Sequence, residues 1–590
     1  MVIFCRLRTG LALLLTVLMA SNAFSQAHAV APPPPPGAKN VVCKNRQVPQ
    51  LVDVTQKTGI KFQHSSDLDK KYIAESMGGG VLVLDYDRDG WPDIYFPNAA
   101  TIAMTLKGQG ARSALYHNNH DGTFTDVTDK AGVAMPCFAM GGAVGDYNND
   151  GWPDMVITCL GHTILYRNNG DGTFTDVSKQ AGIDDPRWST GAAFGDYDND
   201  GFVDLMVTRY VDFQLSDLPA FGSSPTCKYR GLDVQCGPRG LRGAGDSLYH
   251  NNGNGTFSDV SKQAGVDDAR GYYGLGVVWT DVNNTGRPDI YVADDSTPKY
   301  LYRNDGNGKF TDIGLESGTA VSADGSEQGS MGIAVGDYVH NGLPSLYVTN
   351  FADEYNILYK NQGNYDFLDV SYESGVAVAS LPWVKWGTAF VDLDNDGWLD
   401  LISVNGQVYP QVDQLPSGAR YRQPKNLFMN ERNGSFCDAE DQAGPALEIP
   451  RASRGLAIAD FDNDGNVDVV VSDLDGEPMI LRNQGIPGRH WVSFELAGTK
   501  SNRLALGARL KLVAGGMTQT DEIRSGGSYL SNNDFRVHFG LGEATKIDSL
   551  EIKWPSGKVE TIKDLKADQF YAVLEGSGIV DRDRIAPKKK

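Results

Sequence analysis

Short β-branched stretches alternate along the chain with turns rich in glycine and asparagine. Met155–Thr158 and Val469–Ser472 are typical of strands, and Asn169–Gly172 is typical of a hairpin turn. Long segments with helical periodicity are missing from the sequence. The pattern therefore predicts an all-β fold.

An acidic loop recurs between the predicted strands. The first copy runs from Asp85 to Asp93, with carboxylates at its positions 1, 3, 5 and 9 and Gly90 at position 6. Glycine lets the chain turn where a side chain would clash. Such recurrence indicates a repeat protein. The copies begin at Asp85, Asp146, Asp196, Asp281, Asp337, Asp392 and Asp460.

Two further motifs recur with the loop, and their order predicts how the repeats close. Each unit has a Leu-Tyr-x-Asn element, as at Leu115–Asn118, and then an aromatic-x-Asp-Val element, as at Phe124–Val127. This gives about four strands per unit. The last unit lacks its aromatic-x-Asp-Val strand. A similar strand, Leu51–Val54, stands before the first loop and belongs to no complete unit. Pairing these two ends predicts a closed seven-bladed β-propeller over residues 48–486, without a long exposed sheet edge.

The C-terminal part has a different pattern. Leu550–Trp554 and Phe535–Phe539 alternate apolar and polar positions, the period of a half-buried sheet. Residues 487–576 are therefore expected to form a small β-sandwich-like domain. The lysine-ended tail, residues 577–590, is expected to be disordered.

The N-terminus has the pattern of a secretory signal peptide, assigned to residues 1–29. Arg6 and Arg8 precede the apolar run Leu11–Ala20, which is shorter than the ~20 residues of a membrane span. Residues 30–47 form a proline-rich linker, and no later segment of the mature chain is apolar enough to span a membrane.

Six cysteines follow the signal peptide, and an even number in an exported chain suggests disulfides. Fifteen pairings are possible, and Cys227 with Cys236 is favoured by their closeness in sequence. Both lie in an insertion, roughly residues 210–244, that lengthens the third repeat. Such a loop on a rigid scaffold can carry binding specificity or be a structural elaboration.

The chemistry of the acidic loops is that of calcium sites. Ca²⁺ prefers about six to eight oxygens, and side chains on a tight loop supply several, with the position 7 carbonyl adding another. An EF-hand needs a bidentate Glu at position 12 and flanking helices, but Phe96 and Ile157 hold that position in the first two copies. A site between strands is therefore predicted.

Six of the copies are expected to bind Ca²⁺. Those at Asp85, Asp196, Asp392 and Asp460 have four carboxylates, whereas the Asp281 copy has two and is expected to be weaker. In the fifth copy Val339 replaces the position 3 ligand, which leaves a structural turn. The predicted ligands are Asp85, Asp87, Asp89, Trp91, Asp93, Asp146, Asn148, Asp150, Trp152, Asp154, Asp196, Asp198, Asp200, Phe202, Asp204, Asp281, Asn283, Thr285, Arg287, Asp289, Asp392, Asp394, Asp396, Trp398, Asp400, Asp460, Asp462, Asp464, Asn466 and Asp468.

The formal net charge is −21, which argues against nucleic acid and anionic membranes as partners. The acidic loops explain this charge locally. Six bound Ca²⁺ would bring it to about −9. The acidity is therefore attributed to metal sites rather than to a solvated acidic tail.

The motifs resemble known families. The pattern in Gly191–Asp204 and Gly387–Asp400 looks like the FG-GAP/VCBS repeats of integrin alpha-chain propellers. The C-terminal motifs Leu506–Arg509, Gly526–Leu530 and Trp554–Gly557 resemble the ASPIC/UnbV domain. Together they are similar to the family of cartilage acidic protein and its bacterial relatives. The resemblance implies a secreted calcium-binding protein without an established enzymatic role.

The favoured interpretation is a non-enzymatic binding or adhesion module of the cell exterior, secreted or at a bacterial envelope, whose partner is a protein or glycan. The sequence has no Gly-x-Ser-x-Gly elbow, His-Glu-x-x-His zinc helix or phosphate-binding glycine loop. The alternatives are a hydrolase or lyase acting on polysaccharide and an assembly factor for exported proteins. A pocket with a carboxylate pair outside the acidic loops would favour the enzyme.

Overall fold

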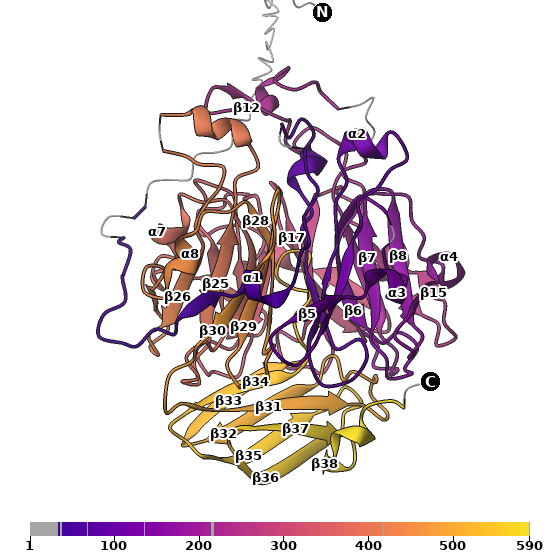
Figure 1. Cartoon of the computed structure of the whole chain (residues 1–590), viewed down its shortest axis with the longest axis vertical. Helices are drawn as coiled ribbons and strands as arrows, with labels where there is room; N and C mark the ends of the chain where they lie inside the picture. The colour runs from indigo at the N-terminus through magenta and orange to yellow at the C-terminus, as the bar shows by residue number, and fades with distance from the viewer. Residues whose placement is uncertain are drawn as a thin grey trace, which may run out of the picture.

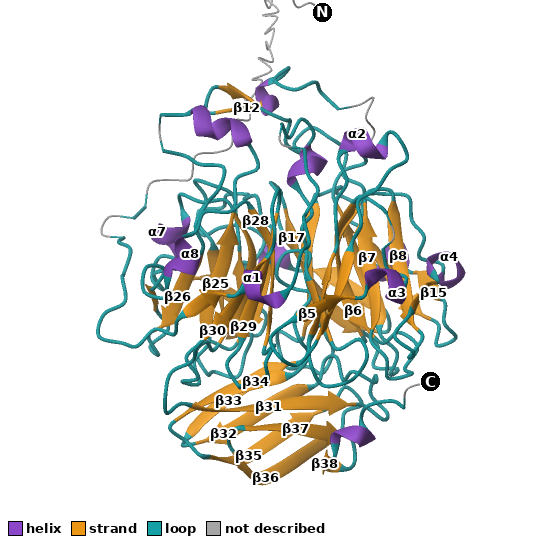
Figure 2. Cartoon of the chain, viewed as in Figure 1, coloured by secondary structure: helices purple, strands orange, loops and turns teal. Residues whose placement is uncertain are grey.

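The computed structural model describes residues 34–35, 38–67, 69–134, 136–213, 218–416 and 418–588; the predicted signal peptide lies outside them. Four-stranded antiparallel sheets surround a central axis, and a smaller β domain lies against one end of this ring (Figure 1). Strands dominate, and the helices are short (Figure 2). The predicted all-β fold is confirmed.

The described part of the ring contains seven four-stranded sheets, which we call blades and number in chain order. The first three blades are β2 (Leu82–Leu84), β3 (Asp93–Phe96), β4 (Ala114–Asn118) and β5 (Phe124–Asp126); β6 (Ala139–Gly145), β7 (Asp154–Cys159), β8 (His162–Asn168) and β9 (Phe174–Asp176); and β10 (Ser189–Gly195), β11 (Asp204–Arg209), β14 (Ser247–Asn251) and β15 (Phe257–Asp259). The next three are β16 (Gly274–Thr280), β17 (Asp289–Asp294), β18 (Tyr300–Gly306) and β19 (Lys309–Asp312); β20 (Ile333–Gly336), β21 (Ser345–Val348), β22 (Ile357–Gly363) and β23 (Asp366–Asp369); and β24 (Lys385–Val391), β25 (Asp400–Asn405), β26 (Asn426–Asn430) and β27 (Phe436–Asp438).

The seventh blade joins the two ends of the ring. It consists of β28 (Ser453–Ala459), β29 (Asp468–Asp473), β30 (Met479–Asn483) and the N-terminal strand β1 (Leu51–Asp53). Leu51 pairs with Asn483, as predicted for the strand that precedes the first loop. The first strands of successive blades pack against one another around the axis, and β28 packs against both β24 and β2.

The aromatic-x-Asp-Val motif ends each outer strand, and before α1, α3, α4, α5 and α6 it starts a single helical turn. Asp126 Oδ1 accepts hydrogen bonds from the Thr128 amide at 3.0 Å and the Thr128 hydroxyl at 2.6 Å, and Gly132 ends the turn at φ 76°. The motif aspartate is thus the structural acceptor that its recurrence indicates. The helices are α1 (Thr55–Thr58), α2 (Ile102–Thr105), α3 (Thr128–Ala131), α4 (Ser178–Ala181), α5 (Ser261–Ala264), α6 (Gly314–Ser317), α7 (Val376–Ser380) and α8 (Pro445–Glu448), with 3₁₀ turns η1 (Ile73–Ser76), η2 (Pro225–Cys227), η3 (Pro410–Gln414) and η4 (Arg582–Arg584).

The asparagine of Leu-Tyr-x-Asn connects each blade to the preceding one. In the third blade, Asn251 Nδ2 donates to the carbonyl of Val203 at 3.0 Å and to that of Tyr147, in the second blade, at 2.8 Å. Asn118 donates in the same way to the Phe461 carbonyl, which links the first blade to the seventh. Equivalent bonds to the preceding blade are made by Asn168, Asn304, Asn361, Asn430 and Asn483.

The C-terminal domain is a sandwich of two four-stranded sheets around a shared apolar core that includes Phe494, Leu510 and Leu550. The predicted sandwich-like fold is therefore correct. The predicted disorder of residues 577–590 is wrong for the part described, because β38 adds to a sheet and Ile585 is fully buried. The sheets are β34 (Val537–Gly542), β31 (His490–Ala497), β37 (Gln569–Leu574) and β38 (Gly578–Val580), and β33 (Met517–Glu522), β32 (Arg509–Ala514), β35 (Lys546–Lys553) and β36 (Val559–Lys566).

A loop of the C-terminal domain, residues 525–534, inserts along the axis of the ring, and we call it the plug. Gly526 and Ser528 form backbone bridges to Val278 and Ile333, which lie in the first strands of the fourth and fifth blades. Tyr529 is fully buried against Trp386, with ring centroids 4.7 Å apart. From the sequence this domain is expected to be separate, but the plug makes it part of the propeller core.

The insertion covers the opposite end of the axis, at the top of Figure 1. It contains β12 (Lys228–Tyr229) and β13 (Leu232–Asp233), and the predicted disulfide between Cys227 and Cys236 is confirmed. The Tyr229 ring packs against Tyr409 at 5.2 Å. The axis is thus closed by the plug from one side and by the insertion from the other.

The position of the plug predicts that adding a side chain at Gly141, in the second blade, destabilises the protein. A Cβ at this position would lie 2.1 Å from the Leu530 carbonyl oxygen, so Gly141→Ala is expected to displace the plug and lower the free energy of unfolding by about 2–3 kcal/mol. Urea unfolding measures this. The control is Gly237→Ala, where an added Cβ has no neighbour within 4 Å; equal unfolding midpoints for the two variants would contradict the account of the plug.

Candidate metal centre

The acidic loops join the first and second strands of each blade, at the end of the ring that faces the C-terminal domain (Figure 1). The first loop lies between β2 and β3, and the others lie between the corresponding strands of later blades. No loop is flanked by helices within the described chain. The predicted strand-loop-strand arrangement is confirmed.

The carboxylates at positions 1 and 9 shape the loop through backbone hydrogen bonds. In the third blade, Asp196 accepts from the amides of Asp200 at 3.0 Å and Gly201 at 3.1 Å. Asp204 accepts from the amides of Tyr197 at 3.2 Å and Asn251 at 2.9 Å. The position 1 pair of bonds recurs in the other loops at Asp85, Asp146, Asp281, Asp337, Asp392 and Asp460.

A second set of bonds links neighbouring loops through position 4, which the sequence analysis missed. Asn199 has a left-handed φ of 58°, a conformation that asparagine tolerates well. Its Nδ2 donates to the Gly286 carbonyl of the next loop at 2.9 Å. Asn463 donates to Gly90 at 3.2 Å and so connects the last loop to the first. The recurrence of asparagine at position 4 was the available signal. Equivalent bonds come from Asn149, Asn284, His340 and Asn395.

The loop carboxylates crowd negative charge into a partly buried space. Burial, together with repulsion by Asp204, Asp200 and Asp198, raises the pKa of Asp196 to about 8. Burial also raises the pKa of Asp289 to about 8, with repulsion by Asp281 adding to it. A bound cation would relieve this repulsion and keep the carboxylates ionised.

The donor set fits a hard divalent cation. Ligand oxygens of Asp196, Asp198 and Asp204 lie within 4.8 Å of one another. In the sixth and seventh loops, Asp394 Oδ1 and Asp462 Oδ1 are buried without a hydrogen-bond partner. Carboxylate oxygens are the ligands that Ca²⁺ prefers. The structure thus brings predicted ligands together, while the bound ion and the position 7 carbonyls stay predictions.

Basic side chains from other segments also reach the loops. Arg46, from the N-terminal linker, lies 2.8 Å from Asp394, and Arg432 lies 2.6 Å from Asp396. At the C-terminus, Arg582 lies 2.6 Å from Asp85. These long-range ion pairs offset part of the loop charge, and nothing in the local sequence pattern indicated them.

The C-terminal domain covers the loops. Arg536 Nη1 donates to Asn463 Oδ1 at 2.6 Å, His538 Nε2 lies 2.7 Å from Asn395 Oδ1, and the Thr520 hydroxyl donates to Asp337 at 2.7 Å. The acidic face is therefore an internal junction between the two domains and not an open surface for a partner. Further contacts come from Arg503 to Asn149, Lys553 to Asn284 and Arg582 to Asp85.

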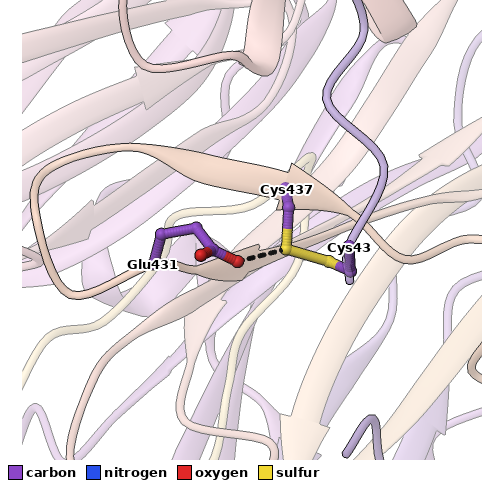
Figure 3. A group of neighbouring side chains, drawn as sticks. All are labelled: Cys43, Glu431 and Cys437. Carbon is purple, nitrogen blue, oxygen red and sulfur yellow. Dashed lines mark hydrogen bonds between the residues drawn. A yellow bond between two sulfur atoms is a disulfide. The ribbon is translucent and has the colours of Figure 1, made fainter. Parts of the chain in front are cut away.

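A separate group of possible metal ligands, Cys43, Glu431 and Cys437, is a disulfide with a nearby carboxylate (Figure 3). A Glu431 oxygen lies 2.6 Å from Cys437 Sγ. Because the bonded sulfurs have no proton and neither cysteine is a free thiolate, this group is not a metal centre. The disulfide instead ties the N-terminal linker to β27.

Two regions of the chain match known protein families. The FG-GAP-like repeat matches residues 85–157, 146–207, 233–292 and 281–348, and the ASPIC and UnbV family matches residues 498–580. The chain is therefore an FG-GAP-like repeat protein with a C-terminal ASPIC and UnbV domain. In the described residues, no helix combines the length and apolar character needed to cross a membrane.

The chain is also homologous to cartilage acidic protein 1. It is 27% identical to the Xenopus tropicalis protein, over 54% of this chain and 47% of that protein. It is 27% identical to the Homo sapiens protein, over 54% of this chain and 46% of that protein. The match spans about half the length of these relatives.

Solved propeller structures show a more distant similarity. An Agrocybe aegerita lectin that recognises non-reducing terminal N-acetylglucosamine is 18% identical with a TM-score of 0.35, covering 68% of this chain and 87% of the lectin. Trypanosoma rangeli sialidase is 11% identical with a TM-score of 0.33, covering 74% and 58% of the two chains. These scores are too low to indicate a shared ligand or activity.

The loop geometry gives Asp204 and Asp198 different roles: Asp204 shapes the loop through backbone hydrogen bonds, whereas Asp198 is predicted to act mainly as a calcium ligand. In chelator, Asp204→Ala is expected to lower the free energy of unfolding by about 2–4 kcal/mol, because two buried amides lose their acceptor. Asp198→Ala, at an exposed position, is expected to cost less than about 1 kcal/mol in chelator but to lose part of the stabilisation that calcium confers. Denaturant unfolding with and without calcium measures both. Equal losses in chelator would contradict this division.

Proposed function

We propose that the chain is a secreted binding or adhesion module in which calcium stiffens the acidic loops and the face opposite the C-terminal domain binds the partner. Three disulfides support an oxidising, extracellular or envelope location. The repeat family and the relationship to cartilage acidic protein 1 support a binding role rather than an enzymatic one.

One observation carries the assignment of the partner surface. The C-terminal domain covers the acidic end of the ring, whereas the insertion and the α2 region project from the other end (Figure 1). Two large apolar side chains are exposed there, Leu106 at 67% and Phe221 at 39%. Projecting loops on a rigid scaffold often carry binding residues. The partner is a protein or glycan of the cell exterior.

The alternative, a hydrolase or lyase acting on polysaccharide, requires a carboxylate pair outside the acidic loops. Asp246 and Asp268 do line a cavity near the insertion. However, only 3% and 6% of their surfaces are exposed. A polymer in the cavity would therefore reach little of either carboxylate, and the binding role is the function that the geometry supports best.

Calcium binding by the loops is tested by ion counting. The mature chain is stripped with chelator and then equilibrated with about 1 mM Ca²⁺, a typical extracellular concentration. Asp198→Ala is expected to retain one ion per chain fewer than the wild type, because its loop loses the position 3 ligand. The control is Asp184→Ala, an exposed aspartate outside the loops. Identical counts for both variants would exclude a calcium site in the third loop.

The partner surface is tested by screening the mature protein against arrays of glycans and of matrix and envelope proteins. Leu106→Ala with Phe221→Ala is expected to weaken a captured interaction at least tenfold. The matched control is Leu315→Ala, an apolar side chain 63% exposed on α6 at the outer side of the fourth blade. An equal loss with the control, or full binding by the double variant, would contradict the assignment of this face.

A further inference from the structure

Three aspartates outside the acidic loops are buried between the third and fourth blades. Asp246 precedes β14, Asp268 follows α5 and Asp294 ends β17. Their exposed fractions are 3%, 6% and 1%. Because β17 starts in an acidic loop and ends at Asp294, the three side chains lie toward the end of the ring opposite the C-terminal domain. Single equivalents occur elsewhere, as Asp185 for Asp268 and Asp473 for Asp294, but the other repeats do not carry all three.

The strand register brings Asp246 and Asp294 together. Asp294 pairs with Gly274 across β16 and β17, and paired positions on antiparallel strands project to the same face of the sheet. A Cβ at Gly274 would lie 3.1 Å from Asp246 Oδ1. The Asp246 carboxylate therefore occupies the space over Gly274, beside the Asp294 side chain.

Asp268 reaches the same face through Tyr300. The Tyr300 hydroxyl donates to Asp268 Oδ1 at 2.7 Å. Tyr300 pairs with Val292, which is two residues from Asp294 and so shares its face of the sheet. Burial, and then the negative charges of Asp246 and Asp268, raise the pKa of Asp294 well above its usual value. This repulsion agrees with the closeness of the three carboxylates.

Most oxygens of this group lack a hydrogen-bond partner. Asp246 Oδ1 accepts from the Arg209 amide at 2.8 Å, but its Oδ2 has none. Asp268 Oδ2 is likewise buried without a partner, and both oxygens of Asp294 lack a hydrogen bond of normal geometry, although the Tyr300 amide is near enough to act on the Asp294 carboxylate.

The ammonium group of Lys299 is also unpartnered, and burial lowers its pKa to about 8. The guanidinium groups of Arg209 and Arg187 also lie near Asp246 and act to lower its pKa, but both already pair with Asp185. Unpaired buried charge is costly.

A cavity of about 740 Å³ reaches two members of the group, and Asp294 is not part of its lining. Asp246 and Asp268 line it, together with Ser247 and Tyr273. A hydrated ion can therefore approach from solvent and exchange part of its water shell for the unpaired carboxylate oxygens. Water in the cavity can supply the remaining ligands.

We propose that Asp246, Asp268 and Asp294 bind a divalent cation that prefers oxygen ligands, of the class of Ca²⁺, between the third and fourth blades. This site is distinct from the acidic loops and does not depend on them. Asp246 directly follows the insertion, so the bound ion joins the base of the insertion to the fourth blade. The ion thereby fixes the segment that carries Phe221.

The test counts Ca²⁺ bound by the full mature chain after chelation and equilibrium dialysis. The double variant Asp246→Asn/Asp294→Asn is expected to bind one ion fewer per chain than the wild type. Asp267→Asn, a half-buried neighbour that lines the same cavity, is the matched control and is expected to keep the wild-type count. Asp198→Ala reports separately on an acidic loop, so failure of one kind of site is distinguished from failure of the other.

Stability provides a second readout. In chelator the double variant is expected to be at least as stable as the wild type, because carboxylate repulsion is removed, and to gain less stability from Ca²⁺. Asp268→Asn keeps the Oδ1 acceptor for Tyr300 and is expected to weaken this site at least tenfold even if the double variant folds poorly. Unchanged ion counts in the folded variants, with unchanged affinity in Asp268→Asn, would overturn the proposal.

Discussion

The ring depends on a buried hydrogen-bond chain that runs from each acidic loop into the preceding blade. In the third blade, Asp204 accepts a hydrogen bond from the Asn251 amide, and the Asn251 side chain donates one to the Tyr147 carbonyl of the second blade. Each such group left unpaired costs about 1–3 kcal/mol when buried. In the fifth copy, bonds of this kind do not require the predicted position 3 ligand. Asp337 and Asn361 keep their structural bonds there, although Val339 has replaced the position 3 ligand.

The acidic motif therefore has structural roles besides its predicted role in calcium binding. Positions 1 and 9 shape the loop and are also predicted ligands, position 4 bridges to the next loop, and position 5 accepts the position 7 amide, as Asp200 does from Phe202 at 2.8 Å. A cation at these loops would stiffen a surface on which the C-terminal domain already rests. The plug extends the contact between the C-terminal domain and the propeller along the axis of the ring. One end of the ring thus contacts the C-terminal domain, whereas the other end is an exposed face that includes the insertion.

Features encoded by local repeats could be predicted from the sequence. The strands, the loop positions and the Cys227–Cys236 disulfide follow from short-range patterns, and the long-range pairing of Leu51–Asp53 with the last blade follows from the strand count of each repeat. Long-range contacts outside the repeat pattern could not be predicted. The plug looks like an ordinary glycine-rich loop, and Arg46 and Arg582 lie far in sequence from the carboxylates they contact. Gly141 in β6 was a usable signal, because glycine inside a strand often marks close approach by another backbone.

The central claim is that the propeller and the C-terminal domain form one cooperative unit, since the plug and the loop contacts are shared between them. Differential scanning calorimetry of the mature chain in calcium tests this most directly. The account predicts a single transition in which both parts unfold together. A separate transition for the C-terminal domain, with the propeller still folded, would contradict it.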